Sequence, residues 1–502
     1  MMVKVFGCSL YGLNGLQVTV EVNVSRGAKF YMVGLPDNAI KESHQRISAA
    51  LKNIGMKIPV KEIIVNLAPA DLRKEGSAFD LTIAIGILAA TGQIDINGFL
   101  SKYFIMGELS LDGNLRSIKG VLSMAVLAKK NGFRGIVVPY GNANEASLVD
   151  GIEVIPVTNL KDLINHINGI QKIPPNKDHI NKINKNHFLD FKDVKGQQSV
   201  KRALEIAAAG GHNILLIGPP GSGKSMLAKR LPSILPDLTN QEILETSQIY
   251  SISNQLETKY IGEPPFRSPH HTISDVGMVG GGKFPKPGEV SMAHKGVLFL
   301  DEVPEFKKNV LEVLRQPLED KEITVSRALH SVVFPADLML IGAMNPSPEG
   351  GFYHPDKSSF SVKSMKKYLA KLSGPFLDRI DLQIEVNPVP VFELSKEFEE
   401  ESSILIRERV IRARNIQLSR SGVKNSSLQE NLIQQHCKLS KESSNLLRIA
   451  SEKINLSARA YSKVKKIART IADLDNSKMI KSYHIAEAIQ YRTLDKMNKF
   501  LN

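Results

Sequence analysis

At residues 218–225 the chain reads Gly218-Pro219-Pro220-Gly221-Ser222-Gly223-Lys224-Ser225, which has the spacing G-x-x-x-x-G-K-S of a phosphate-binding loop. The apolar run before it, 213–217, predicts a strand, and the residues after it, 225–231, predict a helix. Glycines let backbone N–H groups turn toward phosphates, and a helix N-terminus favours negative charge. Lys224 would contact the β- and γ-phosphates, and Ser225 would bind Mg²⁺. We therefore expect ATP and Mg²⁺ as cofactors.

Two further strands end in polar residues that suit this chemistry. The apolar run 296–300 is followed by Asp301 and Glu302. Asp301 would hold the Mg²⁺ shell and Glu302 would orient the attacking water, because phosphoryl transfer depends mainly on positioning and charge stabilisation. The run 338–344 delivers Asn345 at its carboxyl end, where ligands meet parallel sheets. Asn345 would hold the lytic water or sense the γ-phosphate, and the alternative is a turn-forming Asn before a proline.

Two arginines complete the predicted catalytic set. Arg379, within Leu377-Asp378-Arg379-Ile380-Asp381, would reach the γ-phosphate of a neighbouring subunit, and the alternative is a local pair with an adjacent aspartate. Arg459 opens a basic helix near the C-terminus and would clamp the same phosphate, and the alternative is a surface charge. We favour the functional interpretation for both.

Composition describes an ordinary globular protein of 502 residues, with 42% hydrophobic and 23% charged residues. The longest apolar stretch, 81–90, is far shorter than the roughly 20 residues of a membrane span. The first residues contain no continuous hydrophobic signal region, and the two cysteines, Cys8 and Cys437, match no zinc spacing. We expect a cytoplasmic protein with no membrane partner and no metal other than Mg²⁺.

The charge balance points to a polyanionic partner. Lys and Arg number 65 against 51 Asp and Glu, a formal net charge of +14. Residues 455–502 alone contain ten Lys and Arg against four Asp and Glu. Such an excess raises the local concentration of nucleic acid, so DNA is the expected partner, although a solvated helix face is the competing interpretation.

The pattern along the chain divides it into four parts. Residues 1–168 mix β-like alternation, as at 17–24, with helical stretches at 39–53 and 81–91, which predicts an α+β domain. Residues 169–189 are rich in Pro, Asn and Lys and predict a linker. Strands alternate with helices over 190–390, the pattern of a parallel α/β core. The apolar spacing over 391–502 is helical and predicts an all-α lid.

Several further runs carry a family resemblance. They are Asp190-Phe191-Lys192-Asp193-Val194-Lys195-Gly196-Gln197, His212-Asn213, Phe266-Arg267-Ser268-Pro269-His270-His271-Thr272-Ile273-Ser274, Pro287-Gly288-Glu289-Val290-Ser291 and Leu300-Asp301-Glu302-Val303-Pro304-Glu305-Phe306. With the nucleotide motifs, they make the chain similar to AAA+ ATPases and, within them, to the magnesium-chelatase-like YifB/ComM family, over 7–492.

The resemblance implies a homohexameric ATPase, and it implies that ComM itself is a DNA helicase that drives branch migration when transforming DNA is integrated. It assigns the Walker B role to Asp301 and Glu302, the sensor 1 role to Asn345, and the finger and sensor 2 roles to Arg379 and Arg459. It places Val194, Gly196 and Gln197 against the adenine. The chain departs from the family where a Cys-Pro-Cys-Gly run often follows the sensor Asn, because Ser347-Pro348-Glu349-Gly350 stands here.

The N-terminal domain resembles the Lon protease catalytic domain, with its ribosomal-S5-domain-2-like fold, through 74–80 and 107–113. A Lon-type protease needs a nucleophilic Ser and a Lys that takes its proton. On the gapless Lon pattern these positions are Ala78 and Leu122, while Ser77 lies one place away and Lys119 three. We therefore expect a non-proteolytic domain that binds DNA or organises the ring.

Two segments are predicted to project into the pore of such a ring. They are 263–294, which interrupts the core between the P-loop helix and the Walker B strand, and 323–333, which predicts a hairpin before the sensor strand. The predicted phosphate contacts within and beside them are Lys283, Lys286, Lys295, Arg327 and His330. Structural loops at subunit contacts are the alternative.

These features favour an ATP-driven hexameric motor that acts on DNA, and the resemblance implies a role in branch migration during integration of transforming DNA. A protein-remodelling ATPase and a magnesium-chelatase-type subunit are the alternatives, and fold analogy alone is a weak argument for either. The two predicted pore segments contain only two aromatic residues of the Phe, Tyr or Trp type, Phe266 and Phe284, which is an argument against a polypeptide substrate.

Overall fold

In the computed structural model the phosphate-binding loop joins a central strand of a parallel sheet to a helix. The structure describes residues 2–96, 98–176, 189–253, 255–256, 260–282, 285–327, 330–347, 349, 367–390, 392, 400–454, 456–492 and 494. These residues form two units, Met1–Ile183 with Asn240–Ile261, and Asn184–Thr239 with Gly262–Asn502. The mixed α/β fold and the helical C-terminal part predicted from the sequence are both confirmed.

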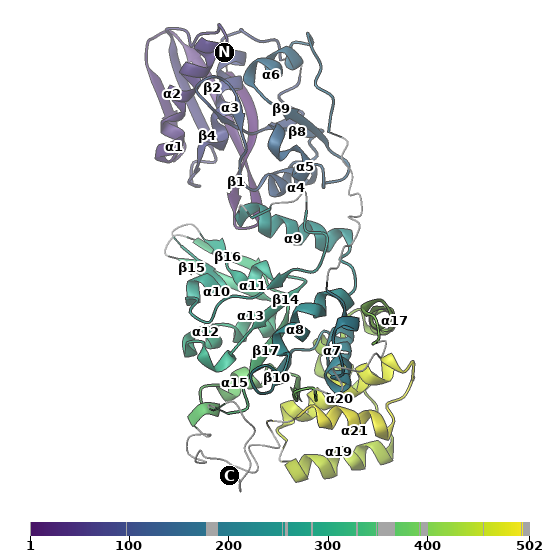
Figure 1. Ribbon diagram of the computed structural model, residues 1–502. Helices are drawn as coiled ribbons and strands as arrows, with labels where there is room; N and C mark the ends of the chain where they lie inside the picture. The colour runs from purple at the N-terminus through teal and green to yellow at the C-terminus, as the bar shows by residue number, and fades with distance from the viewer. Residues whose placement is uncertain are drawn as a thin grey trace. The chain divides into compact units, whose positions relative to one another are not determined.

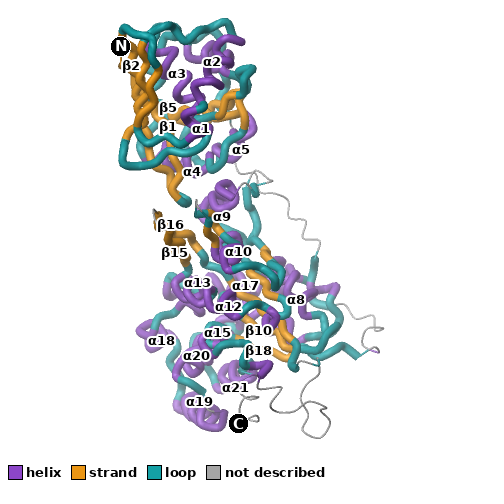
Figure 2. The backbone as a smooth tube through the Cα atoms, turned by 90° about the vertical axis from the view of Figure 1, so that its left-hand side faces the viewer, coloured by secondary structure: helices purple, strands orange, loops and turns teal. Residues whose placement is uncertain are grey.

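The N-terminal unit is built on a seven-stranded sheet in the order β3-β4-β2-β1-β5-β8-β9. β1 and β2 form a long antiparallel hairpin because alternate residues of each face the core, among them Val18, Val20 and Val22. Figure 2 shows α2 and α3 against the sheet. The strands and helices are β1 (Met2–Tyr11), β2 (Asn14–Ser25), β3 (Phe30–Val33), α1 (Asn38–Lys41), α2 (Ser43–Asn53), β4 (Glu62–Ala68), α3 (Asp80–Ala90), β5 (Tyr103–Ile105), β6 (Glu108–Leu109), β7 (Leu115–Arg116), α4 (Val121–Lys130), β8 (Gly135–Pro139), α5 (Ala143–Ala146), β9 (Glu153–Val157) and α6 (Leu160–Ile167).

Every residue of α3 is buried, including the carboxylate of Asp80. Arg46 of α2 binds Asp80 through two charge-assisted hydrogen bonds of 2.7 and 2.8 Å. Burial raises the pKa of Asp80, although the Arg46 guanidinium opposes that shift. The longest apolar stretch of the sequence is therefore a buried helix of a folded domain. No helix within the described ranges is both long and apolar enough to cross a bilayer.

The helix α9 (Asn240–Ser253) belongs to the N-terminal unit, although its sequence lies inside the predicted 190–390 domain. It packs on α4, where Gln248 Nε2 donates to Ser123 Oγ at 3.4 Å and Ile252 lies against Gly120. Beside this contact Asn142 Nδ2 donates to the Glu145 carboxylate at 3.3 Å. Burial raises the pKa of Glu145 to about 7, and Asn142, Ser251 of α9 and the Val121 amide partly offset that rise.

The raised pKa predicts a pH-dependent N-terminal unit. A carboxyl whose folded pKa lies above its unfolded value contributes stability while protonated, and that contribution is lost as pH rises through about 4.5 to about 7, by up to about 3 kcal/mol. We expect amide-exchange protection of α4 in the full-length chain to fall between pH 5 and pH 8, after correction for intrinsic rates. Glu145→Gln should abolish the fall, whereas Asp150→Asn, at an exposed carboxylate of the same unit, should not. Equal pH dependence in wild type and Glu145→Gln would refute the assignment.

The second unit contains a five-stranded parallel sheet in the order β11-β14-β17-β10-β18, flanked by helices (Figure 1). Its elements up to the lid are α7 (Gln198–Gly210), β10 (Ile214–Ile217), α8 (Lys224–Arg230), β11 (Phe266–Arg267), α10 (Asp275–Val279), β12 (Gly280–Gly281), β13 (Lys286–Pro287), α11 (Glu289–Met292), β14 (Val297–Leu300), α12 (Lys308–Val313), α13 (Arg315–Asp320), β15 (Glu322–Arg327), β16 (His330–Pro335), β17 (Met339–Met344), α15 (Gly374–Leu377) and β18 (Leu382–Glu385). β15 and β16 form the predicted hairpin before the sensor strand.

The lid packs on the sheet through one continuous apolar core. Buried side chains of β10, β17 and β18 belong to the same core cluster as those of α7, and α7 contacts β18 on one side and the lid helices α17 and α20 on the other. The lid helices are α17 (Ser403–Ser421), α18 (Glu430–His436), α19 (Lys441–Ile454), α20 (Ala458–Leu474) and α21 (Ser482–Gln490). Because the core is continuous, the lid in this structure is part of the same unit as the sheet.

Candidate active site

The phosphate-binding loop has the backbone geometry that its glycines permit. Gly221 and Gly223 have φ of 77° and 88°, a left-handed conformation that residues with a side chain rarely adopt. A Cβ on Gly218 would lie 2.2 Å from the carbonyl oxygen of Val386, so only glycine fits there. α8 begins at Lys224 with Gly223 as its N-cap, so the free N–H groups of the helix face the loop.

The Lys224 ammonium already lies among oxygen acceptors. Its Nζ donates to Gly218 O at 2.6 Å, to Pro219 O at 2.9 Å and to Asn345 Oδ1 at 3.3 Å. Burial lowers its pKa, and the charges of Asp301 and Glu302 oppose that shift. Phosphate oxygens are acceptors of the same kind. The contact with Asn345 brings the residue predicted as sensor 1 next to the P-loop lysine.

Ser225 and Asp301 supply the oxygen pair expected of a magnesium site. Ser225 Oγ donates to Asp301 Oδ2 at 2.7 Å, across the ends of α8 and β14. Ser222 Oγ is buried in the loop with no hydrogen-bond partner among the described residues, so a ligand oxygen would satisfy it. The described residues contain no cluster of three or more His, Cys, Asp or Glu suited to a metal. These residues fit Mg²⁺ held jointly by Ser225, Asp301 and nucleotide phosphates.

Glu302 has an unusual backbone for a non-glycine residue. Its φ is 52°, and its N–H donates to Asp301 Oδ1 at 3.0 Å. A left-handed residue with a Cβ costs about 1–2 kcal/mol, and such strain concentrates at functional sites. The turn separates the two carboxylates, because Asp301 stays with Ser225 while the Glu302 side chain is exposed.

The two predicted arginines lie at the other end of the sheet. In the parallel pair β10–β18, Ile214 lies opposite Leu382 and Ile217 opposite Glu385. Arg379 therefore precedes the amino end of β18, whereas the P-loop follows the carboxyl end of β10, with roughly 10 Å of strand between these ends. The Arg379 carbonyl accepts a 2.9 Å hydrogen bond from Asn213, at the start of β10. Arg379 thus lies at the end of the sheet opposite to its own P-loop.

Arg379 and Arg459 share one cavity of about 910 Å³ between the sheet and the lid. Arg459 Nη1 lies 3.4 Å from Asp378 Oδ2, directly beside Arg379 in the chain. Arg379 Nη2 pairs with the exposed Glu319, while its Nε is buried without a hydrogen-bond partner among the described residues. The cavity also contains Lys463 and Lys466. Acidic residues line it as well, among them Glu319, Asp378 and Asp381, so both guanidinium groups are paired with carboxylates in this structure. Two guanidinium groups that share one cavity suit a phosphate from outside the subunit, which would take the place of these carboxylates.

Of the residues predicted to contact the adenine, Gln197 lies next to the P-loop. Its φ is 58°, and its side chain donates to Ser222 O at 3.4 Å. The other two are engaged by the chain itself, since Gly196 N donates to Glu400 Oε1 at 2.7 Å and the Val194 carbonyl accepts from Lys201 Nζ at 2.5 Å.

Comparison with known proteins places the chain among the magnesium-chelatase-like proteins. The family descriptions that match are magnesium chelatase, subunit ChlI, over 190–394, subunit ChlI of Mg-chelatase over 20–142, and the ChlI C-terminal part over 400–492. The chain is 45% identical over 501 residues to competence protein ComM of Haemophilus influenzae, covering 98% of each chain. It is 43% identical over 491 residues to the uncharacterized protein YifB of Escherichia coli, covering 97% of this chain and 96% of the other.

The chain belongs to the YifB/ComM family of magnesium-chelatase-like AAA+ proteins. Membership implies ATPase activity with ATP and Mg²⁺. A part of the chain is also similar to Lon protease 2 of Bacillus subtilis, with 28% identity over 181 residues that cover 32% of each chain.

The Lon-like part does not present a serine–lysine dyad at the positions considered above. Ser77 Oγ donates to the Glu108 carboxylate, and Lys119 is exposed. The Lon-pattern lysine position is taken by Leu122, which is buried in α4. We therefore still predict that the Lon-like N-terminal domain, residues 1–168, is not a protease.

The predicted DNA contacts fall into three groups. Lys286 is exposed on the short β12–β13 hairpin. Arg327 and His330 lie opposite each other at the turn end of the β15–β16 hairpin. The structure does not describe the side chains of these two residues, and Lys283 lies outside the described residues altogether. Lys295 differs, because its ammonium lies 3.1 Å from Asp337 and its side chain is largely buried.

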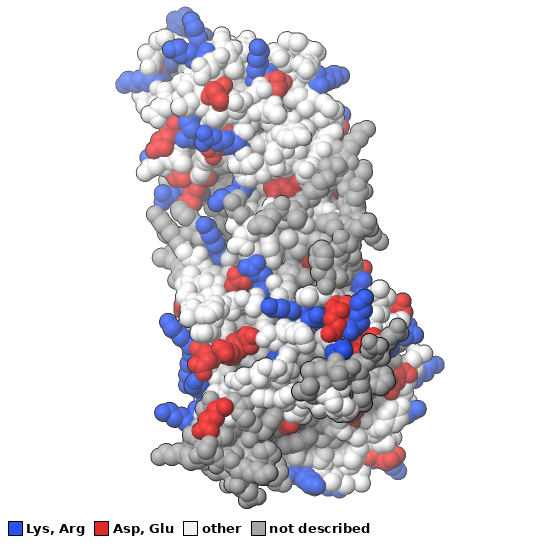
Figure 3. All heavy atoms as spheres, in the orientation of Figure 1, with Lys and Arg blue, Asp and Glu red and all other residues white. Residues whose placement is uncertain are grey.

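Lys295 is therefore better assigned to structure than to DNA. Asp337 collects three lysines, with Lys321 at 3.2 Å and Lys424 of the lid at 3.3 Å. Burial raises the pKa of Asp337, but the three ammonium groups outweigh burial and hold it well below its usual range. On the face drawn in Figure 3, basic and acidic side chains are interspersed, so DNA binding there would depend on local loops and not on one broad basic field.

Proposed function

We propose that this chain is an ATP-driven homohexameric motor that acts on DNA, as a branch-migration helicase in the integration of transforming DNA. The observation that carries the proposal is the separation of the two halves of the active site. Lys224, Asp301 and Asn345 meet at the carboxyl end of the sheet, while Arg379 and Arg459 share a cavity at the amino end. A second copy that places its arginines on the phosphates would complete the site.

A closed ring of identical subunits satisfies this requirement at every interface, because a head-to-tail contact repeats until it closes. Mechanistically, the P-loop amides and Lys224 would hold the triphosphate, Glu302 would orient water, and the neighbour's Arg379 would stabilise the transferred phosphoryl group. Hydrolysis then changes the contact between neighbours, which can move elements such as the β15–β16 hairpin.

DNA as the substrate is supported by the net charge of +14 and by the similarity to a protein named for competence. Lys286 and the tips of the β15–β16 hairpin are the proposed contacts. They would bind phosphates without reading sequence, and such binding weakens as salt rises.

The test is the steady-state ATPase rate with and without four-way or forked DNA. We expect DNA to raise the rate several-fold and junctions to move in the presence of ATP. Lys224→Ala should abolish both by removing phosphate binding, whereas Lys172→Ala, outside the nucleotide site, should behave as wild type. Stimulation by unfolded protein together with indifference to DNA would support the protein-remodelling alternative instead.

A further inference from the structure

Lys463 of the lid helix α20 binds the backbone on both sides of Arg379, the predicted arginine finger. Lys463 Nζ donates to Asp378 O at 2.6 Å and to Ile380 O at 2.8 Å, the two carbonyls on either side of Arg379. The same ammonium lies 3.1 Å from Asp381 Oδ1. Its side chain is only 15% exposed, so these are its contacts in place of solvent. A single cation thus fixes the backbone of 378–381 from the lid side.

Asp381 connects the same loop to the sheet. Its Oδ2 lies 3.3 Å from His212 Nδ1 and 3.3 Å from the backbone N of Asn213. Burial raises the pKa of Asp381, but Lys463 and His212 outweigh burial and hold it well below its usual range. Asn213 then bonds the Arg379 carbonyl and accepts the Leu340 N–H at 2.8 Å, which links the loop to β17.

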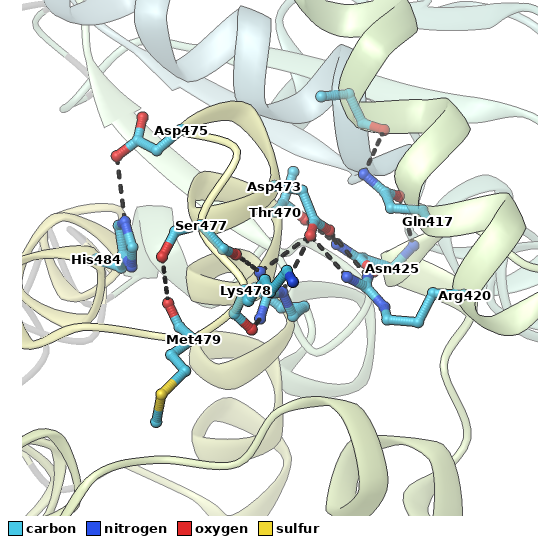
Figure 4. Close-up of polar contacts among 12 residues, drawn as sticks. Gln417, Arg420, Asn425, Thr470, Asp473, Asp475, Ser477, Lys478, Met479 and His484 are labelled. Carbon is cyan, nitrogen blue, oxygen red and sulfur yellow. Dashed lines mark hydrogen bonds and ion pairs between the residues drawn. The ribbon is translucent and has the colours of Figure 1, made fainter.

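His212 also enters the interior of the lid. Its Nε2 lies 2.8 Å from Thr470 Oγ1 of α20, and Thr470 Oγ1 accepts from Asn425 Nδ2 at 3.0 Å. Figure 4 shows Thr470 and Asn425 beside Asp473, whose carboxylate is bound by Arg420 from α17. The polar chain is therefore unbroken from the lid core to the loop that carries Arg379.

Arg459 and Lys463 are both on α20, four residues apart and so on one face of the helix. Arg459 contacts Asp378, and Lys463 holds the carbonyl of the same Asp378. The lid helix that carries one guanidinium thus grips the loop that carries the other.

We propose that Lys463 is a positioning residue that joins Arg379 and Arg459 into one rigid pair, so that both guanidinium groups are presented together to a neighbour's phosphate. This inference rests on the proposed function, because it assumes that both arginines act on an adjoining subunit. Without Lys463 the Asp378 and Ile380 carbonyls lose their donor and Asp381 loses its cation. Arg379 would then sample positions outside the productive one, and a misplacement of about 1 Å can cost about 100-fold in rate.

The test compares Lys463→Met and Lys463→Arg in the full-length chain. Methionine keeps the length and apolar stem but donates nothing, so we expect kcat for ATP hydrolysis to fall by about 10- to 100-fold with the KM for ATP nearly unchanged. Arginine can still donate to both carbonyls and should recover a substantial part of kcat. Lys465→Met, two residues along and on another face of α20, should behave as wild type. Wild-type turnover in a folded Lys463→Met protein would overturn the proposal.

Two further measurements separate positioning from folding. Thr470→Val keeps the side-chain volume but removes the hydroxyl that contacts His212, so it should also lower kcat. This variant provides an independent test if Lys463→Met fails to fold. Mixing Lys463→Met with Lys224→Ala subunits should restore ATP hydrolysis, because the intact P-loop of one variant then meets the intact Arg379–Lys463–Arg459 set of the other. A folding defect in Lys463→Met would not be rescued in this way. Wild-type turnover in Thr470→Val, or no rescue on mixing, would count against the positioning role of Lys463.

Arg379→Ala serves as the reference that distinguishes the two failures. If Arg379→Ala retains turnover, the shared site itself is wrong. If Arg379→Ala loses turnover while Lys463→Met keeps it, the active site is still shared between subunits, but Lys463 does not position Arg379.

Discussion

Arg379→Ala is expected to lower kcat for ATP hydrolysis by about 10³-fold or more, the range of an arginine finger, while the Kd for ATP stays within about threefold of wild type. The reason is its position at the amino end of β18, away from the P-loop of its own chain. Its loss should therefore leave nucleotide binding by the P-loop intact and remove only transition-state stabilisation at a neighbour. Phosphate release measures the first quantity and a fluorescent nucleotide the second.

The matched control is Arg448→Ala. Arg448 is 61% exposed and pairs with Glu452 one turn along the same helix, so its removal should change neither quantity. A large loss of ATP affinity in Arg379→Ala would mean that this arginine contacts the nucleotide of its own subunit, against the observed register.

Glu302→Gln is expected to lower kcat by about 10²- to 10⁴-fold, the contribution typical of a residue that activates water. Glutamine keeps the shape but removes the charge that polarises the nucleophile, so ATP should bind and stay unhydrolysed. The Ser225–Asp301 pair does not depend on this side chain, because Ser225 Oγ donates directly to Asp301 Oδ2 at 2.7 Å.

Glu305→Gln is the control for this second prediction. Glu305 lies three residues beyond Glu302, is half exposed and pairs with Lys371 at 3.0 Å, outside the predicted pocket. Single-turnover chemistry and ATP trapping should both separate the two variants. Normal turnover in Glu302→Gln would remove Glu302 from the mechanism.

Local sequence was enough to predict the parts of the fold that depend on short-range chemistry. The P-loop, the Asp301–Glu302 strand end and the β15–β16 hairpin each combine an apolar strand pattern with a turn or polar end, and the structure has all three. The all-helical lid followed from apolar spacing in the same way.

The rest depends on contacts between distant residues. The grouping of α9 with the N-terminal unit rests on packing against α4, more than a hundred residues earlier, which no local pattern contains. Its charge and its place beside a predicted pore loop made Lys295 a candidate phosphate contact. In the structure its ammonium instead pairs with Asp337, which also binds Lys321 and Lys424. His212 stood in a family motif without an assigned role, because its partners Asp381 and Thr470 are 169 and 258 residues away.

The central claim is that each active site is shared between two subunits, and mixing Arg379→Ala with Lys224→Ala tests it most directly. Each variant alone lacks turnover, but in a randomly mixed ring about one quarter of the interfaces combine an intact P-loop with an intact arginine. The account predicts that equal mixing restores ATP hydrolysis well above the sum of the separate variants. A mixture that stays at that sum, although the subunits assemble together, would contradict it.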